Sequence, residues 1–575
     1  MKKAFLLLSS LLISSLSYGV NNDNDTLRVP EKRQLNEQNY RGQTLTIYNS
    51  ADYIDEELIT LFEEETGAKV NYYTFDTNET MYNQFTLQPE GTYDLICTSD
   101  YMVQRMVREG LVEPINLQEE CPIYDEYASP MVRNKLASMY ADTDNDGIKD
   151  TSLDSYCAGY MWGTLGIIYD PYCSDTIRED VKSWDVFWDD KYENLISIKN
   201  SMRDTFTVGL LHAYGGSPYS DVPALLTEAR NTYLDDLKNA YLESIVDEEK
   251  IDTIRTNYNN VIQNVLDYVI TEEDYQKVID LVKNELIELK KNIFGFEVDS
   301  GKNDIITGKI KLNLAWSGDA VYSIQTAASE GDGKVLEYYV PDDGSNIWYD
   351  GWVLPNKANR DLACAFIDFL SDPTYATQNM EYIGYTSFIA SDDVFSMACD
   401  WYGCGEYFAE REYYAENEEG EIDASYVHYN DKFYRCIKDS IGNLPTNETY
   451  FEEVDPEEEG LSTEPYDLSF LFESNISEGR SALLYPFEDS QNALLTQYPD
   501  LETITRCAVM NDFEDANSAV VIMWGQIRAY TNMVPYYVFL GITLGAVLTF
   551  FIYRLIKKHV SLKNKRQLAK KSNNE

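Results

Sequence analysis

The chain has 575 residues, with 98 acidic and 46 basic side chains and a formal net charge of −52. Hydrophobic residues make up 44%, enough for a large buried core, which excludes wholesale disorder. The acidic excess argues against a nucleic-acid-binding protein, which needs a basic surface, and suits a cationic ligand. Only three histidines occur, and no nucleophile–base motif is visible. We therefore expect no catalytic residues and no enzymatic activity.

The N-terminus predicts export from the cytoplasm. Lys2 and Lys3 precede an uncharged, mostly apolar run, and Ser17 and Gly19 provide small residues at a cleavage site. This is the pattern of a secretory signal peptide, which we assign to residues 1–19. An uncleaved N-terminal anchor is the alternative. Residues 20–42 are largely polar, and we expect them to form a flexible spacer.

Near the C-terminus, residues 533–553 contain no charged side chain. As a helix, this segment would be long enough to cross a hydrocarbon core of about 30 Å. It is followed by a tail, residues 554–575, with eight basic residues and one acid. By the positive-inside rule, the tail stays in the cytoplasm. The sequence therefore predicts one transmembrane helix that anchors an extracytoplasmic protein in the cytoplasmic membrane.

Strand and helix patterns alternate after the spacer. Leu45 and Ile47 show the two-residue period of a strand, whereas residues 54–62 show helical spacing before Gly67. Further strands are predicted at residues 70–75 and 95–97, and this alternation indicates an α/β fold with a largely parallel sheet. Ligands bind such sheets at the carboxyl ends of strands, so the loops that follow the first and third strands are candidate site loops.

Two stretches resemble insertions. Residues 224–291 are charged and helical, with apolar stripes that include Leu234 and Tyr241 and, further on, Val278 and Leu286. Residues 399–492 are acidic, irregular and rich in tyrosine, as expected of a solvated surface insertion. Partner binding is the alternative for both. Within the second stretch, Cys399 and Cys404 are close enough in sequence to pair in an oxidising compartment.

An aspartate-rich loop has the spacing of a calcium site. Acids stand at positions 1, 3, 5 and 9 of the twelve-residue pattern, and a glycine stands at the sharp turn. These acids are Asp142, Asp144, Asp146 and Asp150. Position 12 is Leu153, where a bidentate acid is usual. A surface turn explains the pattern equally well. Bound calcium would be structural, and we expect no other cofactor.

Aromatic and acidic residues occur together at the predicted strand ends. The pairs are Asp52 with Tyr53, Asp100 with Tyr101, Trp316 with Asp319, and Trp348 with Asp350. Carboxylates bind ammonium groups, and aromatic faces cover methylenes and attract cations. This combination favours a binder of amines, although each tryptophan taken alone is consistent with an ordinary core position.

These residues lie in motifs that resemble the spermidine/putrescine-binding proteins of ABC importers. The order and spacing of the motifs hold over most of residues 43–530. The matching segments are LTIYNSADYI (45–54), FEEETGAKV (62–70), TNETMY (77–82), YDLICTSDY (93–101), YMWGTLGI (160–167), SMRDTF (201–206), NLAWSGD (313–319), WYDGW (348–352) and YIGY (382–385).

The resemblance implies a bilobal clamp of the periplasmic-binding-protein type II architecture. Lobe 1 would comprise residues 43–158 and 350–395, and lobe 2 residues 159–349 and 396–532, with both insertions in lobe 2. The ligand-binding residues implied by the resemblance are Asp52, Tyr53, Ser99, Tyr101, Asp204, Trp316, Trp348, Asp350 and Tyr385. Asp350 would hold one ammonium group, and Asp52 or Asp204 a more distant one. Ser50 and Ser201 depart from the family, which usually has a tryptophan and, in spermidine binders, an acid at those positions.

The implied function is capture of a polyamine and delivery to a membrane permease with a cytoplasmic ATPase. Two alternatives remain open at this point. One is the same clamp binding an amino-acid derivative, a sugar or a metal chelate. The other is a calcium-stabilised interaction protein of the cell surface, for which we would expect no converging acids in the site.

Overall fold

The structure, a computed structural model, divides into two units, Met1–Val521 and Ile522–Glu575. The residues it describes are 40–144, 146–242, 247–272, 274–297, 300–330, 334–416, 423–472, 475–477, 479–530, 543–545, 548–550, 552–554 and 557. The predicted signal peptide and most of the predicted spacer and span lie outside these residues. Among the residues described, no helix is long and apolar enough to cross a membrane.

The first elements confirm the predicted α/β alternation. Strand β1 (Thr44–Ser50) pairs in parallel with β2 (Lys69–Phe75) and with β3 (Leu95–Ser99). Helix α1 (Glu56–Thr66) lies between the first two strands in sequence, and α3 (Asp100–Arg108) follows the third. The Asp55 side chain caps α1 by accepting a hydrogen bond from the Glu57 N–H, and Gly67 ends it with a left-handed φ of 70°.

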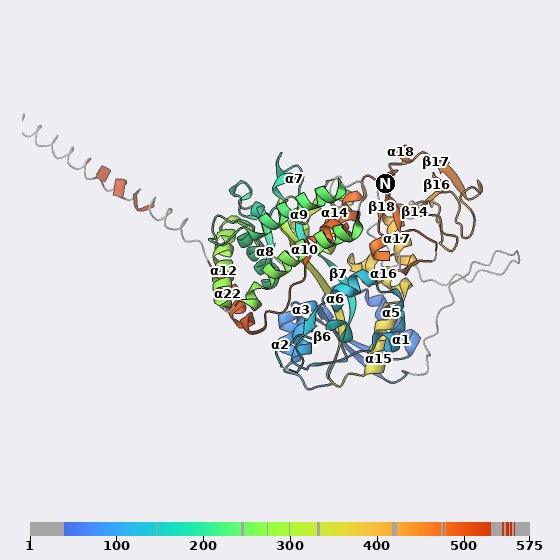
Figure 1. The fold of residues 1–575 in the computed structure, drawn as a ribbon, viewed down its shortest axis with the longest axis horizontal. Coiled ribbons are helices and arrows are strands. Elements are labelled where there is room, and N and C mark those ends of the chain that lie inside the picture. Colours follow the sequence, from blue (N-terminus) through green and yellow to red (C-terminus); the bar gives the residue numbers. More distant parts are fainter. Residues whose placement is uncertain are drawn as a thin grey trace, which may run out of the picture. The chain divides into compact units, whose positions relative to one another are not determined.

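One sheet has the strand order β2-β1-β3-β12-β7-β10-β8-β9. Helices α1 and α3, which follow two of its first strands in sequence, both lie in the lower part of Figure 1. The outer strands of its second end are β8 (Ile196–Lys199), β9 (Gly295–Glu297) and β10 (Leu312–Trp316). Below, the first lobe means the part built on β1, β2 and β3, and the second lobe the part built on β8, β9 and β10.

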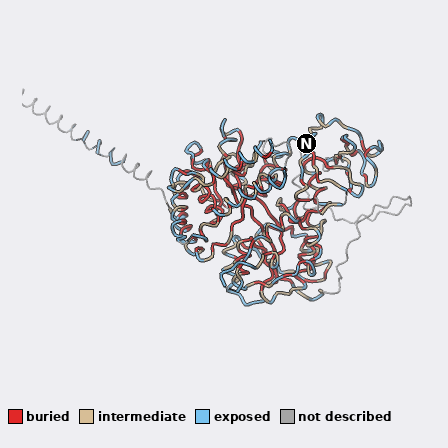
Figure 2. The backbone as a smooth tube through the Cα atoms, viewed as in Figure 1, coloured by how far each residue is buried: buried red, intermediate tan, exposed pale blue. Residues whose placement is uncertain are grey.

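The two central strands join the lobes. Strand β7 (Cys157–Tyr169) is buried along its whole length, and β12 (Ser345–Pro355) pairs antiparallel with both β3 and β7. The prediction of a largely parallel sheet is therefore wrong at the centre, because the chain crosses between the lobes in alternating directions. Buried positions run through the interior of both lobes (Figure 2).

The first insertion is helical, as predicted. It contains α9 (Leu225–Tyr241), α10 (Glu248–Leu266), α11 (Tyr268–Thr271) and α12 (Tyr275–Asn292). Helix α12 buries Val278 and Leu286 and packs against α8 (Met202–Gly215), where a side chain at Gly209 would collide with Leu286. The predicted stripe on α9 is wrong: Leu234 and Tyr241 are about half exposed, and α9 instead packs through Leu226, Tyr233 and Ala240.

The second insertion forms a sheet of its own, which its irregular sequence did not predict. The strand order is β17-β16-β15-β14-β19-β18. The strands are β14 (Gly403–Glu406), β15 (Tyr426–Tyr429), β16 (Lys432–Cys436), β17 (Phe451–Val454), β18 (Tyr466–Asp467) and β19 (Leu483–Pro486). Several tyrosines of this segment are core residues rather than surface residues. Cys399 and Cys404 are free, buried thiols, so the disulfide suggested by their spacing is not formed.

Candidate ligand-binding site

Asp350 lies at the centre of the predicted site. It stands on β12 opposite Ser99 of β3, where the pairing of β12 with β7 shifts register. Its Oδ2 accepts a hydrogen bond of 2.8 Å from the Tyr53 hydroxyl, whereas its buried Oδ1 has no hydrogen-bond partner. Desolvation raises the pKa of Asp350, and the Ser99 and Tyr53 hydroxyls only partly oppose this rise. A ligand cation would offset the free-energy cost of burying this charged carboxylate.

Asp204 provides a second carboxylate from the other lobe. It lies in the first turn of α8, where the Ser201 hydroxyl caps the helix by accepting from the Asp204 N–H. The Asp204 Oδ2 accepts a hydrogen bond of 3.2 Å from the indole N–H of Trp316. Desolvation raises the pKa of Asp204, and its charge in turn raises the pKa of Asp350. The two acids are therefore electrostatic neighbours, and the positive charges of Arg203 and Lys199 act against the rise in the pKa of Asp204.

Aromatic rings surround Asp350. The Tyr53 and Tyr385 rings meet edge to face at 5.3 Å between centroids, and the Tyr385 and Trp348 rings at 5.7 Å. The Tyr385 hydroxyl donates to Asp319 Oδ1 at 2.9 Å. A Cβ at Gly318 would lie 2.5 Å from the Tyr385 ring, so this ring position requires the glycine. Such rings can cover the aliphatic part of an amine.

Two further predicted residues come from the start of α3, beside this group. The Ser99 hydroxyl accepts from the Asn78 side-chain amide at 2.9 Å, and the Tyr101 hydroxyl donates to Glu79 at 3.0 Å. Asp52 differs from the other predicted residues. It follows β1 with a φ of 52° and is exposed to solvent, so the structure does not bring it into the buried network.

The structure thus brings together eight of the nine predicted residues, which we call the aromatic–acid cluster. Its members are Tyr53, Ser99, Tyr101, Asp204, Trp316, Trp348, Asp350 and Tyr385. The first lobe supplies Tyr53, Ser99 and Tyr101, and the second lobe supplies Asp204 and Trp316. Separation of the lobes would therefore take the cluster apart.

Two buried cations beside the cluster were not predicted. Lys199 is fully buried, with its Nζ 2.8 Å from Asp319 Oδ2 and 3.3 Å from Glu297 Oε1, and it lies 4.6 Å from the centre of the Trp316 ring. The Arg203 guanidinium lies 3.7 Å from the centre of the Tyr101 ring, so it covers one face of that ring. The sequence signal for Lys199 was its place at the end of an apolar strand pattern.

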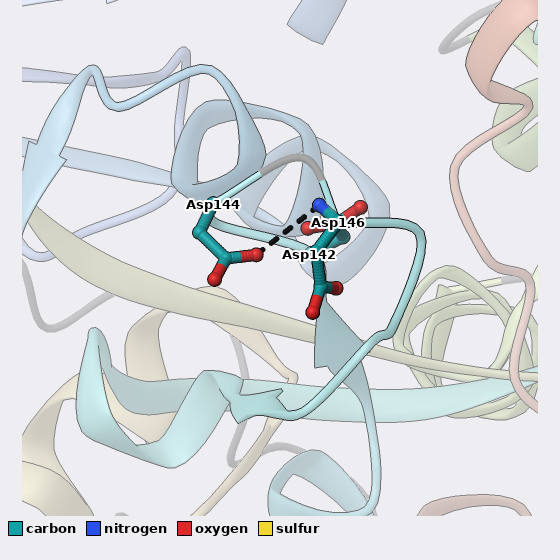
Figure 3. Close-up of side chains that lie close together, drawn as sticks. All are labelled: Asp142, Asp144 and Asp146. Atoms are coloured by element: carbon teal, nitrogen blue, oxygen red, sulfur yellow. Dashed lines mark hydrogen bonds between the residues drawn. The ribbon is translucent and has the colours of Figure 1, made fainter.

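The aspartate-rich loop brings three of its four predicted acids together. Ligand oxygens of Asp142, Asp144 and Asp146 lie within 4.8 Å of one another (Figure 3). Asp142 Oδ2 accepts from the Gly147 N–H at 2.9 Å, and Asp144 Oδ1 accepts from the Asp146 N–H at 3.2 Å. Asp150 is exposed and does not join this group. Carboxylates so arranged can bind a hard cation.

The fold is that of a two-lobed protein in which side chains of both lobes meet at the aromatic–acid cluster. Residues 57–394 match the family model of bacterial extracellular solute-binding proteins, and the chain belongs to that family. Its members bind a solute for a transporter, so this is a binding protein rather than an enzyme, and the family requires no cofactor.

The sequence identity between this chain and individual relatives is low. The chain is 26% identical over 346 residues to the spermidine/putrescine-binding periplasmic protein of Salmonella typhimurium, covering 60% of this chain and 77% of that protein. It is 24% identical over 355 residues to the putrescine-binding periplasmic protein of Escherichia coli, covering 60% and 78%. A solved structure of a putative spermidine/putrescine ABC transporter from Listeria monocytogenes aligns with 85% of this chain and 100% of its own, at 21% identity and a TM-score of 0.49.

Proposed function

We propose that this protein captures a polyamine outside the cytoplasm and delivers it to an ABC permease driven by a cytoplasmic ATPase. The observation that carries the proposal is the buried, unpartnered Oδ1 of Asp350, flanked by aromatic rings and coupled to a second carboxylate, Asp204. An ammonium group would find its counter-ion there, and the rings would cover the methylenes. The names of the relatives in Salmonella and Escherichia coli support the same ligand class.

Calorimetry tests this proposal. The exported part is titrated with putrescine, cadaverine, spermidine and spermine, with a matched monoamine such as butylamine as the control. We expect saturable binding of at least one polyamine and much weaker binding of the monoamine, because Asp204 then lacks its ammonium partner. Absence of binding for all four polyamines would contradict the proposed ligand class.

A different small solute is the second candidate, and Arg203 is the observation that favours it. Its Nε and Nη1 are buried without hydrogen-bond partners, directly beside Tyr101. A ligand with an oxygen acceptor as well as an ammonium group, such as an amino-acid derivative, would satisfy them.

The cell-surface interaction protein is disfavoured, because the acids of the site do converge. We retain the proposed lobe boundaries, 43–158 with 350–395 and 159–349 with 396–532.

The C-terminal anchor is part of the proposed function. Residues 533–553 are long and uncharged enough to cross the membrane, and the basic tail 554–575 supports a cytoplasmic end. A chain that ends at Asn532 should appear in the soluble fraction, whereas the full chain should remain with the membranes. If the shortened chain stays bound after a salt wash, another anchor, such as an uncleaved N-terminus, must hold it.

Calcium binding by the aspartate-rich loop is a further proposal. Asp142, Asp144 and Asp146 repel one another without a cation, so bound calcium should stabilise the folded state. We expect calcium to raise the melting temperature of the wild type relative to a chelator, but not that of Asp144→Asn. Magnesium at the same concentration controls for ionic strength. Coincident melting curves with calcium and with chelator would contradict the proposal.

A further inference from the structure

A segment beyond the family match runs across both lobes. We call residues 505–516 the strap; they follow the second insertion and precede α22 (Asn517–Ala529). The strap includes the short strand β20 (Cys507–Ala508), which pairs in parallel with the start of β12. The family model ends at residue 394, so the strap is additional to the part of the chain that defines the family.

The strap is bound firmly to the second lobe. The Asn259 side-chain amide donates to the carbonyls of Thr505 and Cys507 at 2.8 and 2.7 Å. Gln263 exchanges two hydrogen bonds with the Val509 backbone, at 2.8 and 3.1 Å. Both amide side chains lie on α10 and satisfy backbone groups of the strap. Residues 505–509 of the strap are therefore hydrogen-bonded to the second lobe.

The strap then reaches the first lobe at α3. The Gln104 side chain donates to Asn511 Oδ1 at 3.1 Å and accepts from the Asp512 N–H at 2.7 Å. Arg108 forms an ion pair with Asp512, 2.6 Å from Nη1 to Oδ2, and the Asp512 side chain is only 2% exposed. Further along the strap, Glu514 Oε1 lies 2.5 Å from the Nζ of Lys149, which belongs to the aspartate-rich loop.

The strap also holds the cation beside the aromatic–acid cluster. The Arg203 guanidinium lies between two rings, 3.7 Å from the centre of Tyr101 and 4.0 Å from that of Phe513 in the strap. It donates to the backbone carbonyls of Met510 and Asn511. Tyr101 belongs to the first lobe and Arg203 to the second, so the strap supports a direct contact between the lobes.

We propose that the strap fastens the first lobe to the second, so that the aromatic–acid cluster stays assembled when no ligand is bound. In this arrangement, β7 and β12 are the connections that bend, and the strap contacts with α3 are the ones that must break when the lobes separate. Asp512 and Gln104 are thus positioning residues, which act through α3 on Ser99 and Tyr101. The same contacts should slow the release of a bound ligand, and this part of the inference rests on the proposed function.

The test measures lobe separation without ligand, by hydrogen–deuterium exchange of the full chain in detergent micelles. Asp512→Asn removes the charge that pairs with Arg108 and keeps the side-chain shape, whereas Arg108→Gln removes the other partner, whose side chain is 24% exposed. Both variants should exchange roughly tenfold faster or more at the start of α3 and around Trp316, because a buried charge pair is lost. Glu502→Gln is the matched control, since the ion pair of Glu502 with Arg255 joins α21 (Leu501–Thr505) to α10 and not to α3.

Exchange at these peptides that equals the wild type in both Arg108→Gln and Asp512→Asn would overturn the inference. Faster exchange throughout the protein would overturn it as well, since the effect would then be a general loss of stability. A second measurement, stopped-flow dissociation of putrescine, should show faster release from both variants. The exchange experiment uses no ligand, so it stands even if the protein binds no polyamine.

Discussion

Asp350→Asn should abolish most of the polyamine affinity while the protein stays folded. The change keeps the shape of the side chain and its contact with Tyr53, but it removes the charge that faces a ligand ammonium. Truncating one partner of a buried, hydrogen-bonded charge pair costs about 2–5 kcal/mol, so affinity should fall roughly 30-fold to several-thousand-fold. Calorimetry with the best polyamine ligand measures the change, and circular dichroism verifies folding.

Two further variants and a pH series make this prediction specific. Asp52→Asn should lower polyamine affinity much less, because Asp52 is exposed, and Glu457→Gln on the surface helix α18 (Pro456–Glu459) should leave it almost unchanged.

Because burial raises the pKa of Asp350, the polyamine affinity of the wild type should fall on acidification at a higher pH than it would with an ordinary aspartate. A folded Asp350→Asn protein with unchanged affinity would refute the assignment of Asp350.

The resemblance to the polyamine-binding family, rather than strand periodicity, implied the members of the cluster. It named Asp350 and Ser99, and the structure places them opposite each other because β12 and β3 pair in register. Asp52 shows the limit: a strand end locates the loop, but a left-handed φ, invisible in the sequence, decides whether its side chain joins the interior.

The long-range partners of buried side chains could not be predicted either, because they are far apart in the sequence. Lys199 is adjacent in sequence to neither Asp319 nor Glu297, and a lysine is expected at the surface unless its partners are known. The sheet of the second insertion escaped prediction because its strands have two to five residues, too few for a clear period. Likewise, nothing in residues 505–516 signals the contacts that the strap makes with both lobes.

Lys199→Met should destabilise the protein more than any other single change considered. The Lys199 side chain is 1% exposed and is the shared partner of Asp319 and Glu297. Its removal leaves Glu297 without this buried cation and leaves Asp319 with Lys302 and the Tyr385 hydroxyl. Breaking a buried pair by removing one partner costs about 3–5 kcal/mol, because the remaining charge is uncompensated. Urea denaturation, followed by tryptophan fluorescence, should show a clearly lower midpoint.

The matched control is Lys302→Met, because Lys302 also approaches Asp319, at 3.4 Å, but its side chain is 30% exposed. That change should cost clearly less than Lys199→Met, because the Lys302 side chain reaches solvent and its loss leaves Asp319 paired with Lys199. The deficit of Lys199→Met should also shrink as the pH falls. In the wild type, Lys199 helps to keep the pKa of Asp319 below its usual value, so this stabilisation is present at neutral pH and is lost on acidification through that lowered pKa. In the variant, Asp319 and Glu297 take up protons at higher pH and relieve their burial. Equal denaturation midpoints for wild type and Lys199→Met at neutral pH would show that Lys199 does not stabilise the second lobe.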